Sequence, residues 1–178
     1  WGIARHLTNY LTKRHSLKER LDFAQYSLEL QTGKQSIHFI KKGMTYTLSL
    51  RGQSAIYDIS SLRNLPLSKL DLSKTSVHDI SALHNTPLKK LDLSFTAIQN
   101  IKALNQLPLE ELYLREAPVV SLANLQSKSL KILELGNRKL NLRVLGKFQD
   151  LELLILPKGL YPKSLIENLG LDAEIRFR

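Results

Sequence analysis

Apolar residues recur with a period of 21 residues through the middle of the chain. Residues 67–87, LSKLDLSKTSVHDISALHNTP, align position by position with residues 88–107, LKKLDLSFTAIQNIKALNQL. Both segments begin with alternating leucines, as a short strand does, and continue into a return segment. The pattern predicts a repeat protein whose strands stack side by side. Five apolar positions coincide between the two segments: Leu70 with Leu91, Leu72 with Leu93, Val77 with Ile98, Ile80 with Ile101, and Leu83 with Leu104.

Further units flank these two segments. A first unit contains Leu48 and Leu50, and its later apolar residues lie one position farther on, so its bend contains one inserted residue. A fourth and a fifth unit, beginning at residues 130 and 151, keep their first leucines and then lose the pattern. We therefore expect about five to six repeats over residues 44–157. The three best units each begin directly after a proline, at Leu67, Leu88 and Leu109.

Polar residues also keep fixed places within the unit. The leucines of each strand point into the core, and the residues that alternate with them project from the sheet. Thr75 and Thr96 lie at the bend, where a hydroxyl can hydrogen-bond to backbone. One column of helix-capping residue types precedes an apolar residue of each return segment and predicts a capped helical turn there: Asp58, Asp79, Asn100 and Ser121.

The two ends of the chain depart from the 21-residue period. Residues 1–26 have helical spacing, and Ser16 with Glu19 forms a capping box before a second helix. From Ser27 to Leu50 the apolar period is two, which predicts strands, with a turn signal at Gly43. Residues 164–169 predict a short helix and residues 174–178 a last strand. We expect an N-terminal cap of basic helices and strands over residues 1–43 and a C-terminal cap over residues 158–178.

The consensus L-D-L-S-x-T-x-V-x-D-I-S-x-L, taken from Leu70 to Leu83, resembles bacterial leucine-rich repeats with short units. Such repeats include those appended to serine/threonine protein kinases and those of internalin-like surface proteins. The resemblance implies an α/β solenoid, a leucine-rich repeat horseshoe with a parallel β-sheet on its concave face. It also implies a binding architecture without catalysis of its own, and hence a non-enzymatic module for protein–protein recognition.

The concave face is where a protein partner is expected to bind. The strand residues that project from it combine charges of both signs with aromatic rings and arginine, types that dominate binding energy at interfaces. Farther along, the same columns become apolar at Ile132, Leu153 and Ile155, which would form either an exposed patch or the core of the C-terminal cap. The predicted binding residues are Lys69, Asp71, Lys90, Asp92, Phe95, Tyr113, Arg115 and Glu134.

The net charge of +10 suggests a second kind of partner. Residues 1–43 contain eight Lys and Arg against three acidic residues, whereas residues 44–137 contain ten against eight. A basic helical face can bind nucleic acid or an anionic membrane, and it can equally be the solvated surface of a cap. The residues concerned are Arg5, Lys13, Arg14, Lys18 and Arg20.

Other chemistry finds little support in the sequence. The chain has no cysteine, its five histidines lack metal-binding spacing, and its glycines form no phosphate loop. We therefore expect no metal, no cofactor and no catalytic residues. The chain begins at Trp1 without an initiating Met, which suggests a processed product or a fragment. It could then be the regulatory or sensory region of a larger protein, such as a kinase, and the compartment is left undetermined.

Overall fold

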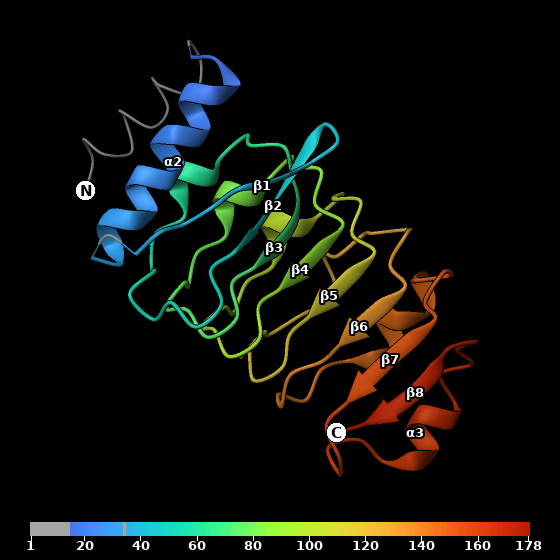
Figure 1. The fold of residues 1–178 in the computed structure, drawn as a ribbon. Coiled ribbons are helices and arrows are strands. Elements are labelled where there is room, and N and C mark those ends of the chain that lie inside the picture. The colour runs from blue at the N-terminus through green and yellow to red at the C-terminus, as the bar shows by residue number, and fades with distance from the viewer. Residues whose placement is uncertain (1–14, 34) are drawn as a thin grey trace.

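A computed structural model describes residues 15–33 and 35–178 of the chain. Their eight strands form one sheet in which spatial order equals chain order (Figure 1). The first two strands pair antiparallel as a hairpin, and every later pair is parallel. The strands are β1 (Ile40–Lys42), β2 (Thr45–Ser49), β3 (Leu67–Asp71), β4 (Lys90–Asp92), β5 (Glu111–Tyr113), β6 (Ile132–Glu134), β7 (Leu153–Leu156) and β8 (Glu174–Phe177).

A ladder of apolar side chains lies beneath this sheet. Leu70 pairs with Leu91 and Leu91 with Leu112, and the ladder continues at the same spacing through β8. All leucines of the ladder are buried. The leucines that follow them two residues later in the chain, such as Leu72 after Leu70, are buried as well. The 21-residue spacing therefore persists through the fourth and fifth units, and the drift seen there is confined to the return segments.

The predicted insertion in the first unit is confirmed. Leu48 pairs with Leu70, 22 positions later, whereas the following rungs are 21 positions apart. The extra residue lies in the bend, between Gly52, which is equivalent to Lys74 of the next unit, and Ile56, which is equivalent to Val77.

Most return segments contain a short 3-10 helix; the capping column predicts it correctly after Asp58, Asp79 and Asn100 and is wrong after Ser121, where the described chain forms no helix. These helices are η1 (Ser60–Leu62), η2 (Ser81–Leu83), η3 (Lys102–Leu104) and the longer η4 (Leu142–Lys147). The Asp79 carboxylate accepts a 2.7 Å hydrogen bond from the N–H of Ser81, which is the first residue of η2. Asp58 and Asn100 accept the same hydrogen bond from the first residues of η1 and η3. At the bend, the Thr75 hydroxyl donates to the Leu72 carbonyl at 2.7 Å, and Thr96 repeats this contact.

The N-terminal cap differs from the sequence-based expectation in the stretch predicted to form strands from Ser27 onward. Helix α2 (Leu17–Gln31) begins with the expected capping box, in which the Ser16 hydroxyl accepts from the Glu19 N–H and the Glu19 carboxylate accepts from the Ser16 N–H. The strand expected from Ser27 is wrong, because the helix continues to Gln31. Leu28 is fully buried, on the helical stripe of Ala24, whereas Leu30 is 55% exposed.

Helix α2 covers the N-terminal end of the repeats. It packs against η1, and its last residue, Gln31, donates to the Asp58 carbonyl and accepts from the Asp58 N–H. The expected turn at Gly43 joins β1 to β2, whereas residues 35–39, which also lie in the stretch predicted to form strands, are not in a strand. The first predicted helix, within residues 1–14, lies outside the described residues.

The C-terminal end adds one more rung to the sheet. The predicted short helix is α3 (Lys163–Glu167), and the predicted last strand is β8, which pairs parallel with β7. Ile132, Leu153 and Ile155 are half-buried on the sheet face, and the last two lie beside Glu174 and Arg176 of β8. In the described part of the chain, no helix has the length and apolar character needed to cross a membrane.

Candidate protein-binding surface

Strands β3, β4 and β5 bring most of the predicted binding residues together in two rows. Lys69, Lys90 and Glu111 occupy one row of neighbouring positions, and Asp71, Asp92 and Tyr113 occupy the next. All six side chains are at least partly exposed on the concave face. A parallel sheet holds neighbouring members of each row about 4.8 Å apart, so the charges form a closely spaced pattern on a rigid frame.

At the centre of this surface, three side chains form an ordered cluster. The Lys90 ammonium makes an ion pair with the Glu111 carboxylate, and the same carboxylate accepts a 2.7 Å hydrogen bond from the Tyr113 hydroxyl. The Lys90 Nζ also lies 5.1 Å from the centre of the Tyr113 ring. The aromatic ring is therefore fixed in position before any partner binds, which limits the loss of side-chain entropy on binding.

The electrostatics of the cluster favour its charged form. Burial alone would lower the pKa of Lys90, but its bond to Glu111 more than offsets this and the net shift is upward. Burial would raise the pKa of Glu111, but hydrogen bonds from Lys90 and Tyr113 reverse this effect and leave the pKa lowered. Burial and the bond to Glu111 raise the pKa of Tyr113. At neutral pH the cluster therefore presents an ion pair and a neutral phenol.

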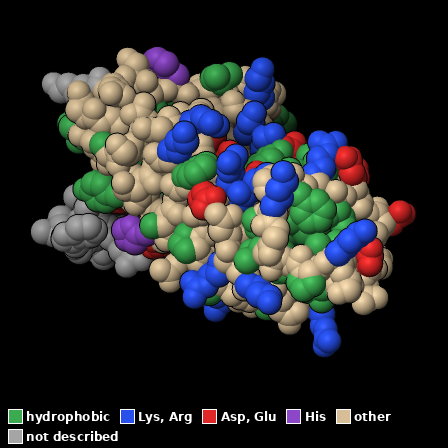
Figure 2. All heavy atoms as spheres, turned by 90° about the horizontal axis from the view of Figure 1, so that it is seen from below, with side chains coloured by type: hydrophobic (Ala, Val, Ile, Leu, Met, Phe, Trp, Pro, Cys, Tyr) green, Lys and Arg blue, Asp and Glu red, His purple; other side chains and the backbone are tan. Residues whose placement is uncertain are grey.

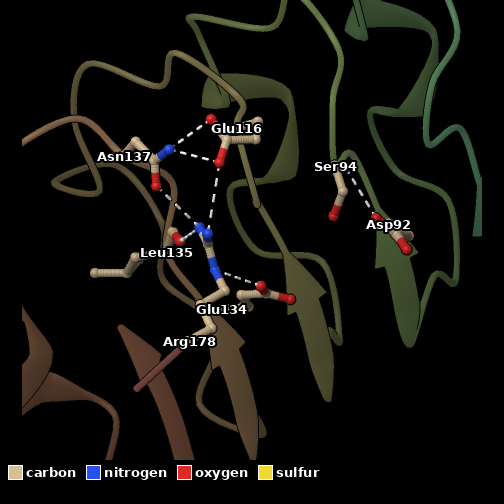
Figure 3. A network of polar contacts seen from close by, with 7 residues as sticks. All are labelled: Asp92, Ser94, Glu116, Glu134, Leu135, Asn137 and Arg178. Carbon is tan, nitrogen blue, oxygen red and sulfur yellow. Dashed lines mark hydrogen bonds and ion pairs between the residues drawn. The ribbon is translucent and has the colours of Figure 1, made fainter. Parts of the chain in front are cut away.

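The two aspartates at the ends of β3 and β4 also serve the fold. The Asp71 Oδ1 atom accepts from the Ser73 N–H at 2.9 Å and from the Ser73 hydroxyl at 2.6 Å. Asp92 accepts in the same way from the Ser94 N–H at 2.8 Å, a contact visible in Figure 3. These bonds turn the chain out of each strand, which explains why the D-x-S pattern repeats.

Phe95 follows β4 at the rim of the concave face. Its side chain is 42% exposed, and its ring lies between two cations from the adjacent repeats. The Lys74 Nζ is 5.5 Å and the Arg115 Cζ 5.4 Å from the ring centre. We call this group of three residues, Lys74, Phe95 and Arg115, the cationic rim.

Glu134 is one of the predicted binding residues that are only partly exposed. Its side chain is only 12% exposed and makes an ion pair of 2.8 Å with the Nε atom of Arg178 (Figure 3). The Arg178 guanidinium also contacts Glu116 at 3.5 Å and donates to the Leu135 carbonyl at 2.9 Å. Burial raises the pKa of Glu134 by more than the Arg178 and Arg115 charges lower it. Glu134 thus holds the C-terminal residue against the repeats.

Sequence reasoning missed two contributors to this surface. Glu111 occupies the same column as Lys69 and Lys90, and this column was the signal that could have added it to the predicted set. Lys74 lies 21 residues before Phe95, in the preceding repeat, so the period itself places it beside the ring. The role of Arg178 had no such signal, because its partners lie 41 to 62 residues away, two to three repeats back along the sheet.

The basic N-terminal residues are only partly described. Arg5, Lys13 and Arg14 lie outside the described residues. Lys18 is exposed on α2, whereas Arg20 donates a 3.0 Å hydrogen bond to the Asn64 carbonyl of the first repeat. Arg20 therefore helps attach α2 to the repeats. Within residues 15–33 and 35–178, no group of His, Asp or Glu is arranged to hold a metal ion.

Comparison with known proteins identifies similar folds. No protein-family model matches the chain, and no curated protein sequence matches it either. An internalin (inlF) from Listeria monocytogenes is 22% identical, with a TM-score of 0.57 over 75% of this chain and 46% of that one. Internalin C2 (inlC2) from the same species is 18% identical, with a TM-score of 0.52 over 87% of this chain and 84% of that one.

These likenesses establish the leucine-rich repeat fold and agree with the resemblance seen in the repeat consensus. At sequence identities of 22% and 18%, the likeness shows the fold alone. The chain spans less than half the length of the inlF internalin.

Proposed function

We propose that this chain is a non-catalytic recognition module that binds another protein through the concave face between β3 and β5. The observation that carries the proposal is the set of aromatic rings held against cations on that face, Tyr113 against Lys90 and Phe95 within the cationic rim. The binding surface is centred on Lys69, Asp71, Lys90, Asp92, Phe95, Tyr113 and Arg115, with Glu111 added and Glu134 at its border.

The physical support is the combination of residue type and rigidity. Tyr and Arg are among the side chains whose truncation most often costs more than about 2 kcal/mol of binding energy, and Phe is enriched with them at interfaces. Here Tyr113 stands on β5, which is held on both sides by β4 and β6, and the Phe95 N–H donates to the Arg115 carbonyl of the next repeat. Little ordering is left for a partner to impose, so the contact energy is largely available for affinity.

The test compares variants of the two sides of the solenoid. Proteins retained by the immobilised chain are identified, produced separately, and their affinity for purified variants is measured by biolayer interferometry. Lys90→Ala with Tyr113→Ala removes the central cluster, and we expect it to weaken binding at least about tenfold.

The matched control is Lys102→Ala, an exposed lysine in η3 among the return segments, away from the sheet. It should leave the affinity unchanged. A partner whose binding is abolished by Lys102→Ala and retained by the double variant would show that the concave face is not the binding surface. Circular dichroism of each variant establishes that a loss of binding does not come from a loss of folding.

A further inference from the structure

Phe95, in the cationic rim, combines a left-handed backbone conformation with an exposed aromatic ring, and stability alone explains neither. Phe95 has a φ of 59°, in the left-handed region, and Lys74 and Glu116 occupy the equivalent positions of the adjacent repeats with φ of 60° and 57°. In the first repeat the corresponding residue is Gly52, whose N–H bonds to the next repeat as the Phe95 N–H does. The left-handed conformation costs an L-residue about 1–2 kcal/mol, and a bulky aromatic is among the least suited residues.

The Phe95 side chain gains little in return within the protein. Its ring is 42% exposed, and exposed cation–π contacts contribute only about 0.5–1 kcal/mol each. A strained backbone that presents an exposed aromatic side chain points to a role outside the fold.

The charge available at the rim is positive. Among the ion pairs of the described residues, none involves Lys74 or Arg115. The carboxylates nearby have partners of their own, Asp92 with the Ser94 N–H and Glu116 with Arg178. Figure 2 views the molecule from the side at which the strands end and shows Lys and Arg side chains spread among exposed hydrophobic ones.

We infer that the cationic rim binds an acidic segment of the partner in which carboxylates flank a large apolar or aromatic side chain. This inference rests on the proposed function and adds the chemistry of the partner to it. The apolar side chain packs on the Phe95 ring, and a carboxylate accepts two hydrogen bonds from the Arg115 guanidinium, a geometry that suits arginine. Lys74 supplies the second positive charge on the other side of the ring.

The experiment uses a randomised linear peptide library displayed on phage as its probe. The whole chain is immobilised, and bound phage are counted by sequencing on the wild type and on Phe95→Asn. Asparagine tolerates the left-handed region, as Asn64 and Asn85 do in this chain, so the variant removes the ring and keeps the bend. We expect enriched sequences to place Asp or Glu beside Phe, Trp or Leu, and to be lost on the variant.

The enriched peptide is then synthesised and its affinity measured. We expect a loss of at least about tenfold with Phe95→Asn and with Arg115→Glu, and a further weakening as salt concentration rises. The matched charge reversal Lys102→Glu, in η3, should have no effect.

Each other outcome decides against the inference. Enrichment of basic or uncharged sequences, no enrichment, or acidic peptides that bind Phe95→Asn equally well would overturn it. If enriched peptides lose binding with Lys90→Ala and Tyr113→Ala but keep it with Phe95→Asn, the proposed concave face stands and the acidic partner at the rim does not. If neither set of variants reduces binding, both proposals fail.

Discussion

Gly136 and Gly146 provide opposite tests of the packing between repeats. A Cβ atom added at Gly136 would lie 2.5 Å from the Ala117 carbonyl oxygen and 2.8 Å from that of Leu114. Both obstacles are backbone atoms of the preceding repeat, so no side chain can rotate away. A Cβ atom added at Gly146, within η4, would meet no atom within 4 Å.

The two substitutions should therefore change stability in opposite directions. Replacing either glycine by alanine restricts the unfolded chain, which stabilises a protein by about 0.4–1 kcal/mol where the fold accepts the methyl group. We expect Gly146→Ala to show that gain. At Gly136 the overpacking costs about 1–3 kcal/mol and exceeds the gain, so Gly136→Ala should be destabilised by up to about 2 kcal/mol.

The assay is urea unfolding followed by far-UV circular dichroism, with the two variants and the wild type measured together. If the free energy of unfolding falls with urea concentration at the same slope in all three proteins, the midpoints report stability and not a change in the surface exposed on unfolding. A Gly136→Ala variant as stable as Gly146→Ala would refute the close approach of the third and fourth repeats. It would also undermine the position of Leu135, whose carbonyl accepts from Arg178.

Further predictions concern the core, the C-terminal contact and the rim. Leu91→Ala, in the middle of the buried ladder, should lower the free energy of unfolding by about 2–5 kcal/mol in urea titrations. Arg178→Ala should cost about 1–3 kcal/mol and speed hydrogen exchange of β8, because it leaves the shielded Glu134 carboxylate unpaired; unchanged exchange would contradict this. Since burial raises the pKa of Glu134, the folded chain binds that proton more tightly than the unfolded chain. The stabilisation that this bound proton provides is therefore full at pH values below about 4.5, the pKa of Glu134 in the unfolded chain. It is lost as the pH rises through the higher pKa of Glu134 in the folded chain. Glu134→Gln should remove that fall from a pH series of urea titrations. Phe95→Asn should stay within about 1 kcal/mol of the wild type, because relief of backbone strain offsets two cation–π contacts.

The sequence predicted what each repeat determines by itself. The positions of Leu70 and Leu91 follow from side-chain alternation along a strand, and Asp79 reaches the N–H of Ser81 two residues on. The bend contact of Thr75 spans three residues. Contacts that span only two or three residues recur in each repeat that keeps those residues, so an alignment of the repeats predicts them.

The sequence failed where the decisive contact is distant or aperiodic. Leu28, Glu29 and Leu30 alternate as a strand would, yet the packing of α2 against η1 keeps them helical. The burial of Glu134 depends on Arg178, which returns from the end of the chain. The two residues lie two repeats apart, so aligning adjacent repeats does not predict their contact.

The constancy of the strand spacing has a consequence for how this surface could change. Return segments of this chain hold a 3-10 helix, a longer one or none, and the strands beside them still pair in register. Insertions and deletions in those segments should therefore leave the proposed binding residues in place. The gain or loss of one complete unit would instead displace everything beyond it by one strand, roughly 4.8 Å along the sheet. A lineage of such proteins could thus change partner in discrete steps, by duplicating or deleting a rung.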